Sequence, residues 1–355
     1  LNQYYYFCLP HVQEYNKAWD FFSGMSPADI EEQIFKANIW ERPTRRFDNF
    51  TNVEENLRRR AEGYRADPFY MGAIVGRFAN RITGGRVTID GETYQLTLKD
   101  GAIHQHGGKE GFNKKVWAAQ TFDRENEAGI ILEYCSADGE EGFPGNLLTR
   151  VTYTLNNKNQ LLVDLYAETD RATIVNLTQH AYFNLAGHDS GTIDGHYLTM
   201  PMSGYLPVNK LHVPIGATAP VDGTPFDFRQ QKAVGLQIDD EHPQIVQGIG
   251  YDHTWVIKER DTDELKHIAL VYEPLSKRTL NVYTTEPSVH LYTGNYLEPV
   301  VKGKNGADYG RRTGLCLEAQ HYPDAPNHPA FPSTIVRPGR PYKSRTVFEF
   351  GVKIY

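Results

Sequence analysis

The chain has 355 residues and a formal net charge of −7, with 37 Lys and Arg against 44 Asp and Glu. This acidic balance, without a long basic block, argues against a protein that binds along a nucleic-acid backbone. No apolar run approaches the roughly 20 residues of a membrane span. The 22 Tyr, 17 Phe, 31 Gly and 20 Pro favour strands and turns over helices.

The first 62 residues differ in character from the rest. Ser26-Pro27-Ala28-Asp29 has the features of a helix start, with Ser at the cap and Pro at the first helical position. A charged segment, 53–62, suggests a second helix. We therefore predict two parts: an atypical helical N-terminal segment, 1–62, and a larger domain, 63–355.

From about residue 70, short alternating runs are separated by turn signals. Arg86–Ile89 leads through Asp90-Gly91 into the run 93–98, which is a strong hairpin signal. Helical patterns between strands are nearly absent, so a parallel α/β fold is disfavoured. The pattern predicts an all-β protein, a sandwich or a barrel. Further strands are predicted at 130–134, 148–155, 161–167, 173–177, 255–258, 268–272, 280–284, 289–292, 314–317 and 346–350, with weak helical turns near 232–236 and 239–246.

A carboxylate stands where a short apolar run meets a Pro-rich segment. The run Gly314–Leu317 suits a buried strand, and Glu318 follows it before the chain becomes polar. The prolines of the stretch 323–332 exclude a helix or a central strand there. Burial would raise the pKa of such a carboxyl toward neutrality, which a general base requires. A surface Glu at a strand end is the alternative from this stretch alone.

Two histidines lie at predicted strand-to-turn points. His106 precedes the pair Gly107-Gly108, whose missing side chains let backbone approach a ligand closely. His180 follows the predicted strand 173–177 among polar and aromatic residues. Either histidine alone is more often structural than catalytic, but together with Glu318 they would supply an acid, a base and a polar stabiliser.

Other polar and aromatic residues suggest a binding site for a hydroxylated ring. Asn80, Arg81 and Asp252 follow apolar or glycine-containing stretches, and a planar guanidinium and a carboxylate can bind vicinal hydroxyls. Three aromatic residues could cover the apolar face of a ring or could instead be core: Trp255, Tyr182 and Phe226.

The sequence offers little support for a metal, a cofactor or a nucleophilic serine. His104 and His106 would point the same way on a strand and could chelate, but no HExxH or CxxC spacing occurs. No GxSxG, P-loop or dinucleotide-binding motif is present. Cys8, Cys135 and Cys316 form no disulfide framework. We expect neither metal nor cofactor and a cytoplasmic protein, with a removed leader left open because the sequence begins with Leu1.

Taken together, these stretches resemble the aldose 1-epimerases (galactose mutarotases). The resemblance spans about residues 64–355, and eight ordered stretches make it far more specific than one short motif. The matching stretches are GAIVGRFANRI (72–82), HQHGGKEGF (104–112), GEEGFPG (139–145), VNLTQHAYFNLAG (175–187), FDFR (226–229), YDHTW (251–255), TTEPSVHLYTGNYL (284–297) and LEAQHYPDAPNHPAFPS (317–333).

The resemblance implies a large antiparallel β-sandwich that interconverts the α and β anomers of hexoses such as galactose and glucose, without a cofactor. It implies that Glu318 is the general base on the anomeric hydroxyl and His180 the general acid on the ring oxygen. It assigns His106 to positioning the sugar. The positions that would bind hydroxyls are Asn80, Arg81, Asp252 and His290. We therefore expect the protein to bind a small aldohexose and neither nucleic acid nor a membrane. We expect it to be a monomer or a weak dimer.

Three departures from the family pattern stand out. His290 occupies a position where Gln is usual, Gln179 replaces an Asn, and residues 1–62 do not resemble the family's opening strands. Two alternatives to the leading function therefore stay open: an epimerase of hexose 6-phosphates, and a sugar-binding module without catalysis.

Overall fold

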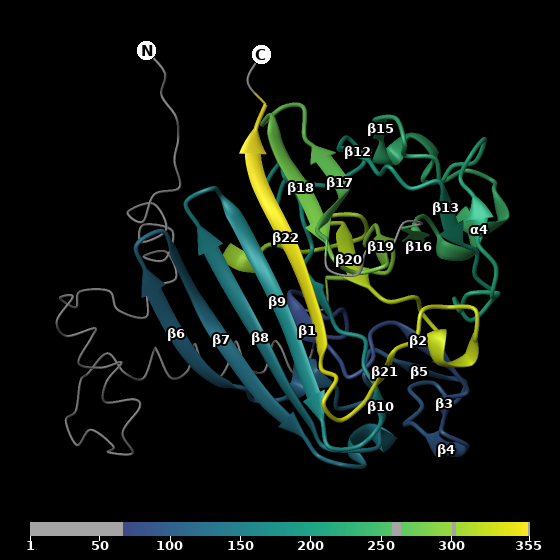
Figure 1. Cartoon of the computed structure of the whole chain (residues 1–355). Helices are drawn as coiled ribbons and strands as arrows, with labels where there is room; N and C mark the ends of the chain where they lie inside the picture. The colour runs from purple at the N-terminus through teal and green to yellow at the C-terminus, as the bar shows by residue number, and fades with distance from the viewer. Residues whose placement is uncertain (1–66, 258–263, 300–302, 354–355) are drawn as a thin grey trace. The chain divides into compact units, whose positions relative to one another are not determined.

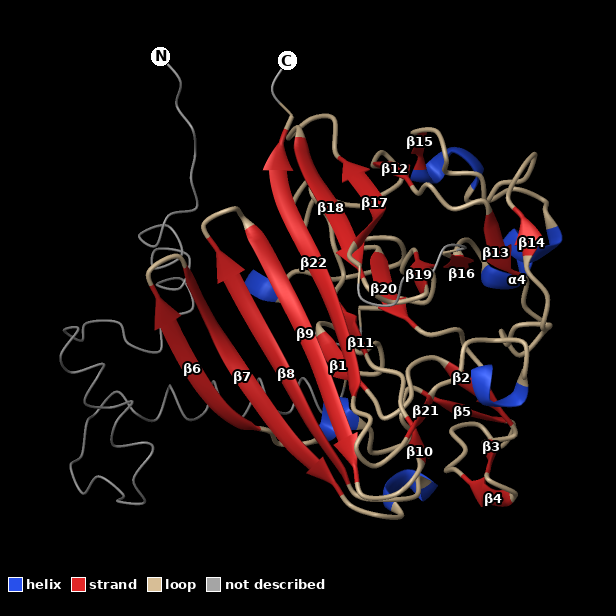
Figure 2. Ribbon diagram, viewed as in Figure 1, coloured by secondary structure: helices blue, strands red, loops and turns tan. Residues whose placement is uncertain are grey.

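A computed structural model of the chain describes residues 67–257, 264–299 and 303–353. The predicted helical segment 1–62 lies outside these residues. The described residues form one unit, built from β-strands with short helical turns (Figures 1 and 2). All the ladders between its strands are antiparallel, which confirms the predicted all-β class.

The larger sheet of the described residues has nine strands and curves along one side of the unit (Figure 1). Its long central strands carry the predicted runs 130–134, 148–155 and 161–167. In spatial order the strands are β15 (Lys232–Ala233), β12 (Tyr197–Thr199), β17 (Lys266–Tyr272), β18 (Arg278–Thr284), β22 (Tyr342–Val352), β9 (Gln160–Thr169), β8 (Leu147–Asn156), β7 (Glu127–Ser136) and β6 (Ala118–Arg124).

A second sheet of five strands packs against the first. One hydrophobic cluster joins Val163 and Val282 of the large sheet with Trp255, Leu291 and Leu317 of the small one. Two antiparallel sheets sharing a core make the predicted sandwich. The order of the small sheet is β14 (Ala219–Pro220), β13 (Gly204–Leu206), β16 (Asp252–Val256), β19 (Ser288–Tyr292) and β20 (Cys316–Gln320).

Four two-stranded ladders and several short helices complete the described structure. The predicted hairpin around Asp90-Gly91 is confirmed as β3 and β4. The predicted strand 173–177 is divided, because its last residues leave the β10 ladder. The ladders are β1 (Ala73–Val75) with β11 (Thr178–His180), β2 (Arg81–Thr83) with β5 (Ile103–Gln105), β3 (Arg86–Ile89) with β4 (Glu92–Gln95), and β10 (Thr173–Ile174) with β21 (Ile335–Val336). The helices are η1 (Phe112–Lys114), η2 (Glu140–Gly142), η3 (Val234–Gln237), α4 (Pro243–Gly248), η4 (Lys304–Gly306) and η5 (Ala325–Asn327).

Candidate active site

The small sheet turns one polar face away from the core. Residues opposite each other on neighbouring antiparallel strands point to the same face, and successive residues alternate. His290 of β19 lies opposite both Thr254 of β16 and Glu318 of β20. Their neighbours in sequence, such as Trp255 and Leu317, enter the hydrophobic core. This alternation places a row of polar side chains on a sheet whose other face is apolar.

A second polar row lies beside the first. Tyr292 of β19 is opposite Asp252 of β16 and Cys316 of β20. The two rows together bring Asp252, His290 and Glu318 to the same face of three strands. The prediction placed Glu318 at a strand end, but it is the middle residue of β20, because the strand continues through Gln320. The face is therefore part of a regular sheet, which holds these side chains more rigidly than a loop would.

Glu318 is a deeply buried carboxyl beside an imidazole. Its side chain is 2% exposed, and Oε1 lies 3.5 Å from Nε2 of His180. Oε2 has no hydrogen-bond partner among the described residues. Burial raises the pKa of Glu318 to about 8, and the negative charge of Asp252 adds to this. At neutral pH this carboxyl is therefore mostly protonated.

His180 is the last residue of β11, a separate short strand, whereas the sequence analysis placed it in the turn after the predicted strand 173–177. Its Nδ1 lies 3.5 Å from the Cys316 thiol, while Nε2 faces Glu318. The ring of Tyr182 stacks against it at 5.1 Å between centroids. Burial lowers the pKa of His180 to about 4. The Glu318–His180 pair is thus electrically neutral at pH 7 and holds one exchangeable proton.

His106 follows β5 in a left-handed backbone conformation, with φ of 49°. Its Nδ1 accepts a hydrogen bond of 3.3 Å from the Asn80 backbone N–H, so the ring's own proton lies on Nε2. The ring centroid is 5.7 Å from that of His180 and 4.7 Å from that of Tyr70. Burial, with smaller contributions from His180 and Arg81, holds the pKa of His106 well below its ordinary value. His106 is therefore a neutral hydrogen-bond donor.

The expected parallel orientation of His104 and His106 is wrong. His104 Nδ1 donates to the Thr97 carbonyl at 2.8 Å, and the ring packs edge-on against Phe143. His106 faces Tyr70 and His180 instead. The left-handed φ at His106 ends the side-chain alternation of β5. The two imidazole rings therefore point to different sides and contact different residues. This pair does not form a chelating site.

Arg81, Asp252 and His290 form a charged cluster on the polar face. His290 Nε2 donates to Asp252 Oδ1 at 2.7 Å, and Thr254 Oγ1 lies 2.9 Å from His290 Nδ1. Arg81 Nη2 is 3.5 Å from Asp252 Oδ2, and its Nη1 donates to Asn80 Oδ1 at 3.2 Å. Burial alone would raise the pKa of Asp252, but Arg81 and His290 hold it far below its usual range. Asp252 therefore stays an acceptor for hydroxyl groups.

The seven residues predicted for the site thus lie in one connected group, although they come from six strands or turns. Two of the aromatic candidates belong to the core: Trp255 and Phe226 are fully buried, and the Trp255 indole donates to the Phe226 carbonyl. Sequence reasoning missed Tyr70 and His212. Tyr70 precedes β1, and no motif marked either residue.

A chain of ring contacts extends the site beyond these residues. Tyr182 contacts Tyr292 at 6.0 Å, and Tyr292 stacks on Tyr296 at 6.3 Å. Tyr296 in turn contacts His212 at 6.3 Å. Aromatic faces beside polar groups suit a ligand that has both hydroxyls and an apolar ring face. Tyr292 and Tyr296 could have been found from the stretch 284–297, which the sequence analysis had already selected.

The donor atoms of His180, Cys316 and Glu318 all lie within 4.8 Å of one another. The His180 ring presents Nδ1 to the thiol and Nε2 to the carboxyl, so an ion bound to one nitrogen would compete with these contacts. Burial also raises the pKa of the Cys316 thiol, which opposes the thiolate that a metal would need. The residues present therefore fit acid/base chemistry better than metal binding.

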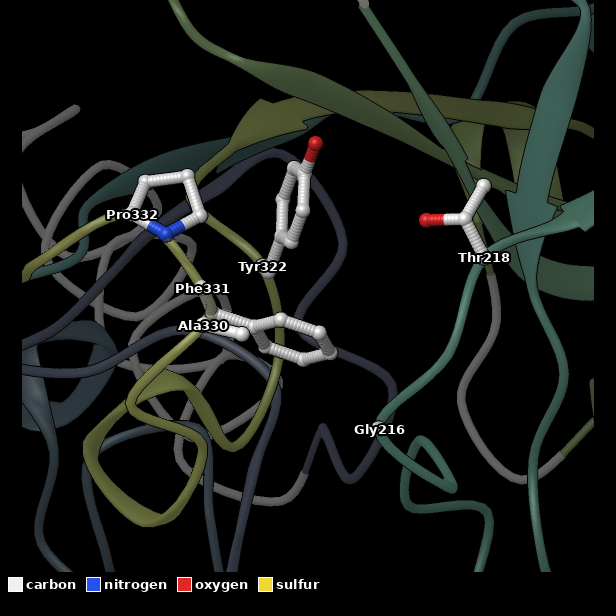
Figure 3. Close-up of a pocket in the computed structure, with 6 residues that line it drawn as sticks. All are labelled: Gly216, Thr218, Tyr322, Ala330, Phe331 and Pro332. Carbon is white, nitrogen blue, oxygen red and sulfur yellow. The ribbon is translucent and has the colours of Figure 1, made fainter.

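A separate pocket of about 400 Å³ lies between two loops (Figure 3). Tyr322 and Phe331 come from the loop that follows β20, and Thr218 faces them from the other loop. None of the seven predicted site residues lines this pocket. This pocket is therefore not formed by the group of polar residues on the small sheet.

Fold and site together define an antiparallel β-sandwich enzyme that works by acid/base chemistry on a hydroxylated ligand. The family model described as aldose 1-epimerase matches residues 48–349. Galactose mutarotase of Mus musculus is 44% identical over 291 residues, covering 82% of each chain. Aldose 1-epimerase of Escherichia coli is 36% identical over 293 residues, covering 81% of this chain and 82% of the relative.

Two solved structures agree with these sequence matches. The GalM/aldose epimerase homologue of C. elegans superposes with a TM-score of 0.73 at 30% identity, covering 82% of this chain and 86% of that one. Galactose 1-epimerase of Lactobacillus acidophilus gives the same TM-score and identity, covering 82% and 83%. The chain belongs to the aldose 1-epimerase family. It is an isomerase that interconverts the α and β anomers of aldoses. Within its described residues, no helix has the length and apolar character to cross a membrane.

Proposed function

We propose that this chain interconverts the anomers of free hexoses such as galactose and glucose, with Glu318 and His180 as its acid/base pair. The observation that supports this assignment is their contact of 3.5 Å inside a buried polar site. The two residues lie far apart in the sequence, so only the fold brings them together. A proton-accepting and a proton-donating group side by side are what ring opening requires.

The reaction begins when the pair's single proton lies on His180, which leaves Glu318 as a carboxylate. Glu318 then removes the proton from the anomeric hydroxyl while His180 delivers its proton to the ring oxygen. The bond between C1 and the ring oxygen breaks, and an aldehyde forms. Both protein groups are now neutral, which is the state that burial favours. Rotation about C1–C2 and closure with reversed roles give the other anomer.

The remaining polar residues bind and orient the sugar. His106 Nε2–H is free to donate toward the ring oxygen, because its Nδ1 is already engaged by Asn80. Asn80, Arg81, Asp252 and His290 form the hydroxyl-binding group. The Asp252 carboxylate accepts from hydroxyl hydrogens and the Arg81 guanidinium donates to hydroxyl oxygens. Fixed orientation of this kind lowers the barrier by holding the anomeric carbon near both reacting groups.

Polarimetry tests the assignment directly. Freshly dissolved α-D-galactose or α-D-glucose should lose optical rotation faster with the wild type than with buffer. Each of Glu318→Gln and His180→Asn should lose about 10²–10⁴-fold, the contribution typical of a positioned acid or base. Glu133→Gln and His267→Asn, on the surface of the nine-stranded sheet, serve as controls and should keep full activity. Full activity in both site variants would refute the roles.

The hexose 6-phosphate alternative has one observation in its favour. Lys99 Nζ lies 3.4 Å from the Tyr70 hydroxyl, and Tyr70 contacts His106, so a second cation stands near Arg81 at the site. A coupled assay with glucose 6-phosphate against glucose distinguishes the two. We expect a higher kcat/KM with the free sugar.

We further propose that residues 63–355 are the catalytic domain and that the protein acts in the cytoplasm as a monomer or weak dimer. The first part is supported by the site, since every residue assigned above lies in this range. The acidic charge of −7 is consistent with a dissolved enzyme of small substrates. Sedimentation at several concentrations would measure the oligomeric state.

A further inference from the structure

A tight turn beside the site holds His212. The turn is closed by an antiparallel bridge between Val208 and Pro214. Asn209 organises it, since its carbonyl accepts from the His212 N–H at 2.9 Å and its side-chain oxygen accepts from the Leu211 N–H at 2.8 Å. His212 itself has a left-handed φ of 56°, which is unfavourable for a residue with a side chain. Residues in such sparsely populated backbone conformations cluster at active sites and ligand contacts.

Helix α4 fixes both the turn and the imidazole. The Gln244 side chain accepts from the Val208 N–H at 2.7 Å and donates to the Val208 carbonyl at 3.0 Å. Gln247 Nε2 donates to His212 Nε2 at 3.2 Å. Because that ring nitrogen accepts, the proton of the neutral imidazole lies on Nδ1.

His212 Nδ1 is buried and has no hydrogen-bond partner among the described residues. It lies 3.5 Å from Asp252 Oδ2, and Arg81 Nη2 lies 3.5 Å from the same oxygen. Hydrogen bonds between N–H and oxygen are usually 2.7–3.2 Å, so neither contact is a good one. The other carboxylate oxygen is already taken by His290 at 2.7 Å. His212 Nδ1–H and an Arg81 N–H thus both point toward Asp252 Oδ2, and neither forms a hydrogen bond of ordinary length with it.

We propose that His212 is a further substrate-binding residue, which rests on the proposed function of this site. His212 Nδ1–H and an Arg81 N–H donate to the oxygen of one sugar hydroxyl, and that hydroxyl donates its hydrogen to Asp252 Oδ2. A hydroxyl offers one donor and two acceptor positions, so it satisfies all three groups at once. Each of the three protein groups then forms a hydrogen bond of ordinary length with the hydroxyl, in place of the two contacts of 3.5 Å.

The same arrangement makes His212 a specificity residue. Hydroxyl groups of epimeric sugars point in different directions from the ring, so only one epimer at that carbon can reach all three protein groups. A site built to bond a hydroxyl discriminates against a sugar that lacks it, because its polar groups are then left unpaired. His212 should therefore contribute to KM and to sugar preference and leave the proton transfers unchanged.

The test uses His212→Leu and His212→Asn in the full chain, with Leu211→Ala as a control in the same turn, where Leu211 is 43% exposed. Initial rates are measured by polarimetry for galactose, glucose and the 2-, 3-, 4- and 6-deoxy analogues. We expect His212→Leu to raise KM about three- to tenfold, the effect of one lost hydrogen bond, with kcat little changed. Asn carries an amide nitrogen near the Nδ1 position, so His212→Asn should recover most of the loss.

The deoxy sugars identify the contact. One analogue should raise KM for the wild type and cause no additional increase in His212→Leu, because the hydroxyl and the imidazole form the same interaction. An equal KM in all variants, or the same additional increase with every deoxy sugar, would overturn the proposal. Thermal midpoints show whether His212→Leu has failed to fold. In that case, the KM values of His212→Asn with the deoxy sugars test the proposal instead. If Glu318→Gln stays active, the proposed acid/base roles fail, while calorimetric titration of sugars still measures binding by His212.

Discussion

Burial gives Glu318 and His180 opposite pKa shifts. The pKa of Glu318 rises from 4.5 to about 8, and that of His180 falls from 6.5 to about 4. Both shifts have the same cause, since a charged group is penalised where water is excluded. The consequence at the scale of single residues is a buried pair that is uncharged at neutral pH. In the proposed ring opening, Glu318 gains one proton and His180 gives one up. The same shifts make the stability of the protein depend on pH.

The stability effect of Glu318 can be isolated above pH 6.5. Between pH 6.5 and 8 the folded protein keeps the Glu318 proton and the unfolded chain does not, so the free energy of unfolding falls as pH rises. His180 is neutral in the folded protein throughout this interval, while the unfolded chain still carries part of its charge near pH 6.5. It therefore adds a smaller, opposite change, which is the same in wild type and Glu318→Gln. The fall should be about 2 kcal/mol over this interval, at 1.36 kcal/mol per pH unit.

Glu318→Gln should remove this fall, because glutamine does not titrate. Denaturant unfolding at pH 6.5 and pH 8.5 measures it, with Glu133→Gln as the surface control. A pH dependence that is identical in wild type and Glu318→Gln would show that the carboxyl is not protonated in the folded state.

His290 offers a second test at a single residue. It gives Asp252 its shortest hydrogen bond, at 2.7 Å, in a buried cluster. Glutamine can donate from a similar place, so His290→Gln should keep most activity. His290→Leu should lose about 10–100-fold in kcat/KM, because a charged hydrogen bond is worth about 1.5–3 kcal/mol. Polarimetry compares the two variants, and equal losses would mean that the hydrogen bond to Asp252 has no role.

At the scale of elements, the turn after β5 determines where His106 lies. Gly107 has φ of 86°, and a Cβ added there would collide with the Gly76 carbonyl oxygen. Gly91, in the hairpin turn between β3 and β4, also has φ of 86°, but a Cβ there meets nothing within 4 Å. The two glycines share this φ and differ in the space that a Cβ would enter.

Replacing each glycine with alanine separates the two effects. Gly91→Ala should cost only the conformational penalty of about 1–2 kcal/mol and leave activity intact. Gly107→Ala should in addition displace the turn, lower the thermal midpoint further and reduce mutarotation, because His106 precedes the glycine directly. Thermal denaturation and polarimetry on both variants measure this. Similar midpoints and activities in the two variants would contradict the proposed role of the turn.

Some strands could be predicted from the sequence pattern alone, and others could not. The hairpin at Asp90-Gly91 and the alternating runs that became β7, β8, β9 and β18 were predictable, because turn chemistry and period-two alternation are local properties. The extent of β20 was not predictable, because its pairing with β19 continues the strand past Glu318. The break after β10 was also missed, because the apolar run 173–177 continues across a change of ladder partner.

At the scale of the whole molecule, the two layers of the sandwich have different tasks. The nine-stranded sheet contributes more residues to the shared core than the five-stranded sheet, which presents the polar face with Asp252, His290 and Glu318. His180 and Arg81 lie on the small ladders β1–β11 and β2–β5, and Asn80 and His106 are next to β2 and β5. His212 lies in the turn after β13. Every one of these elements lies in the range 67–355, which supports residues 63–355 as the catalytic domain.

Two shortened chains test that boundary. We expect a chain of residues 63–355 to fold and to accelerate mutarotation at a rate comparable to the full chain, because the assigned site is complete within it. A chain of residues 48–355 is the matched comparison, since the family match begins at residue 48. Activity in the longer chain only would move the boundary upstream, and inactivity of both would show that the first 47 residues are needed.

The sequence by itself determined the all-β class and the family, and it supplied the residues proposed for acid/base chemistry and hydroxyl binding, because alternation, turn signals and ordered motifs are recorded along the chain. It also identified His290 as a departure, but not the carboxylate that this histidine contacts. Only the tertiary structure decided that Glu318 and His180 touch and that both change their pKa. It also brought His212 to Asp252. These properties depend on distance and on exclusion of water, which arise when strands distant in sequence pack together.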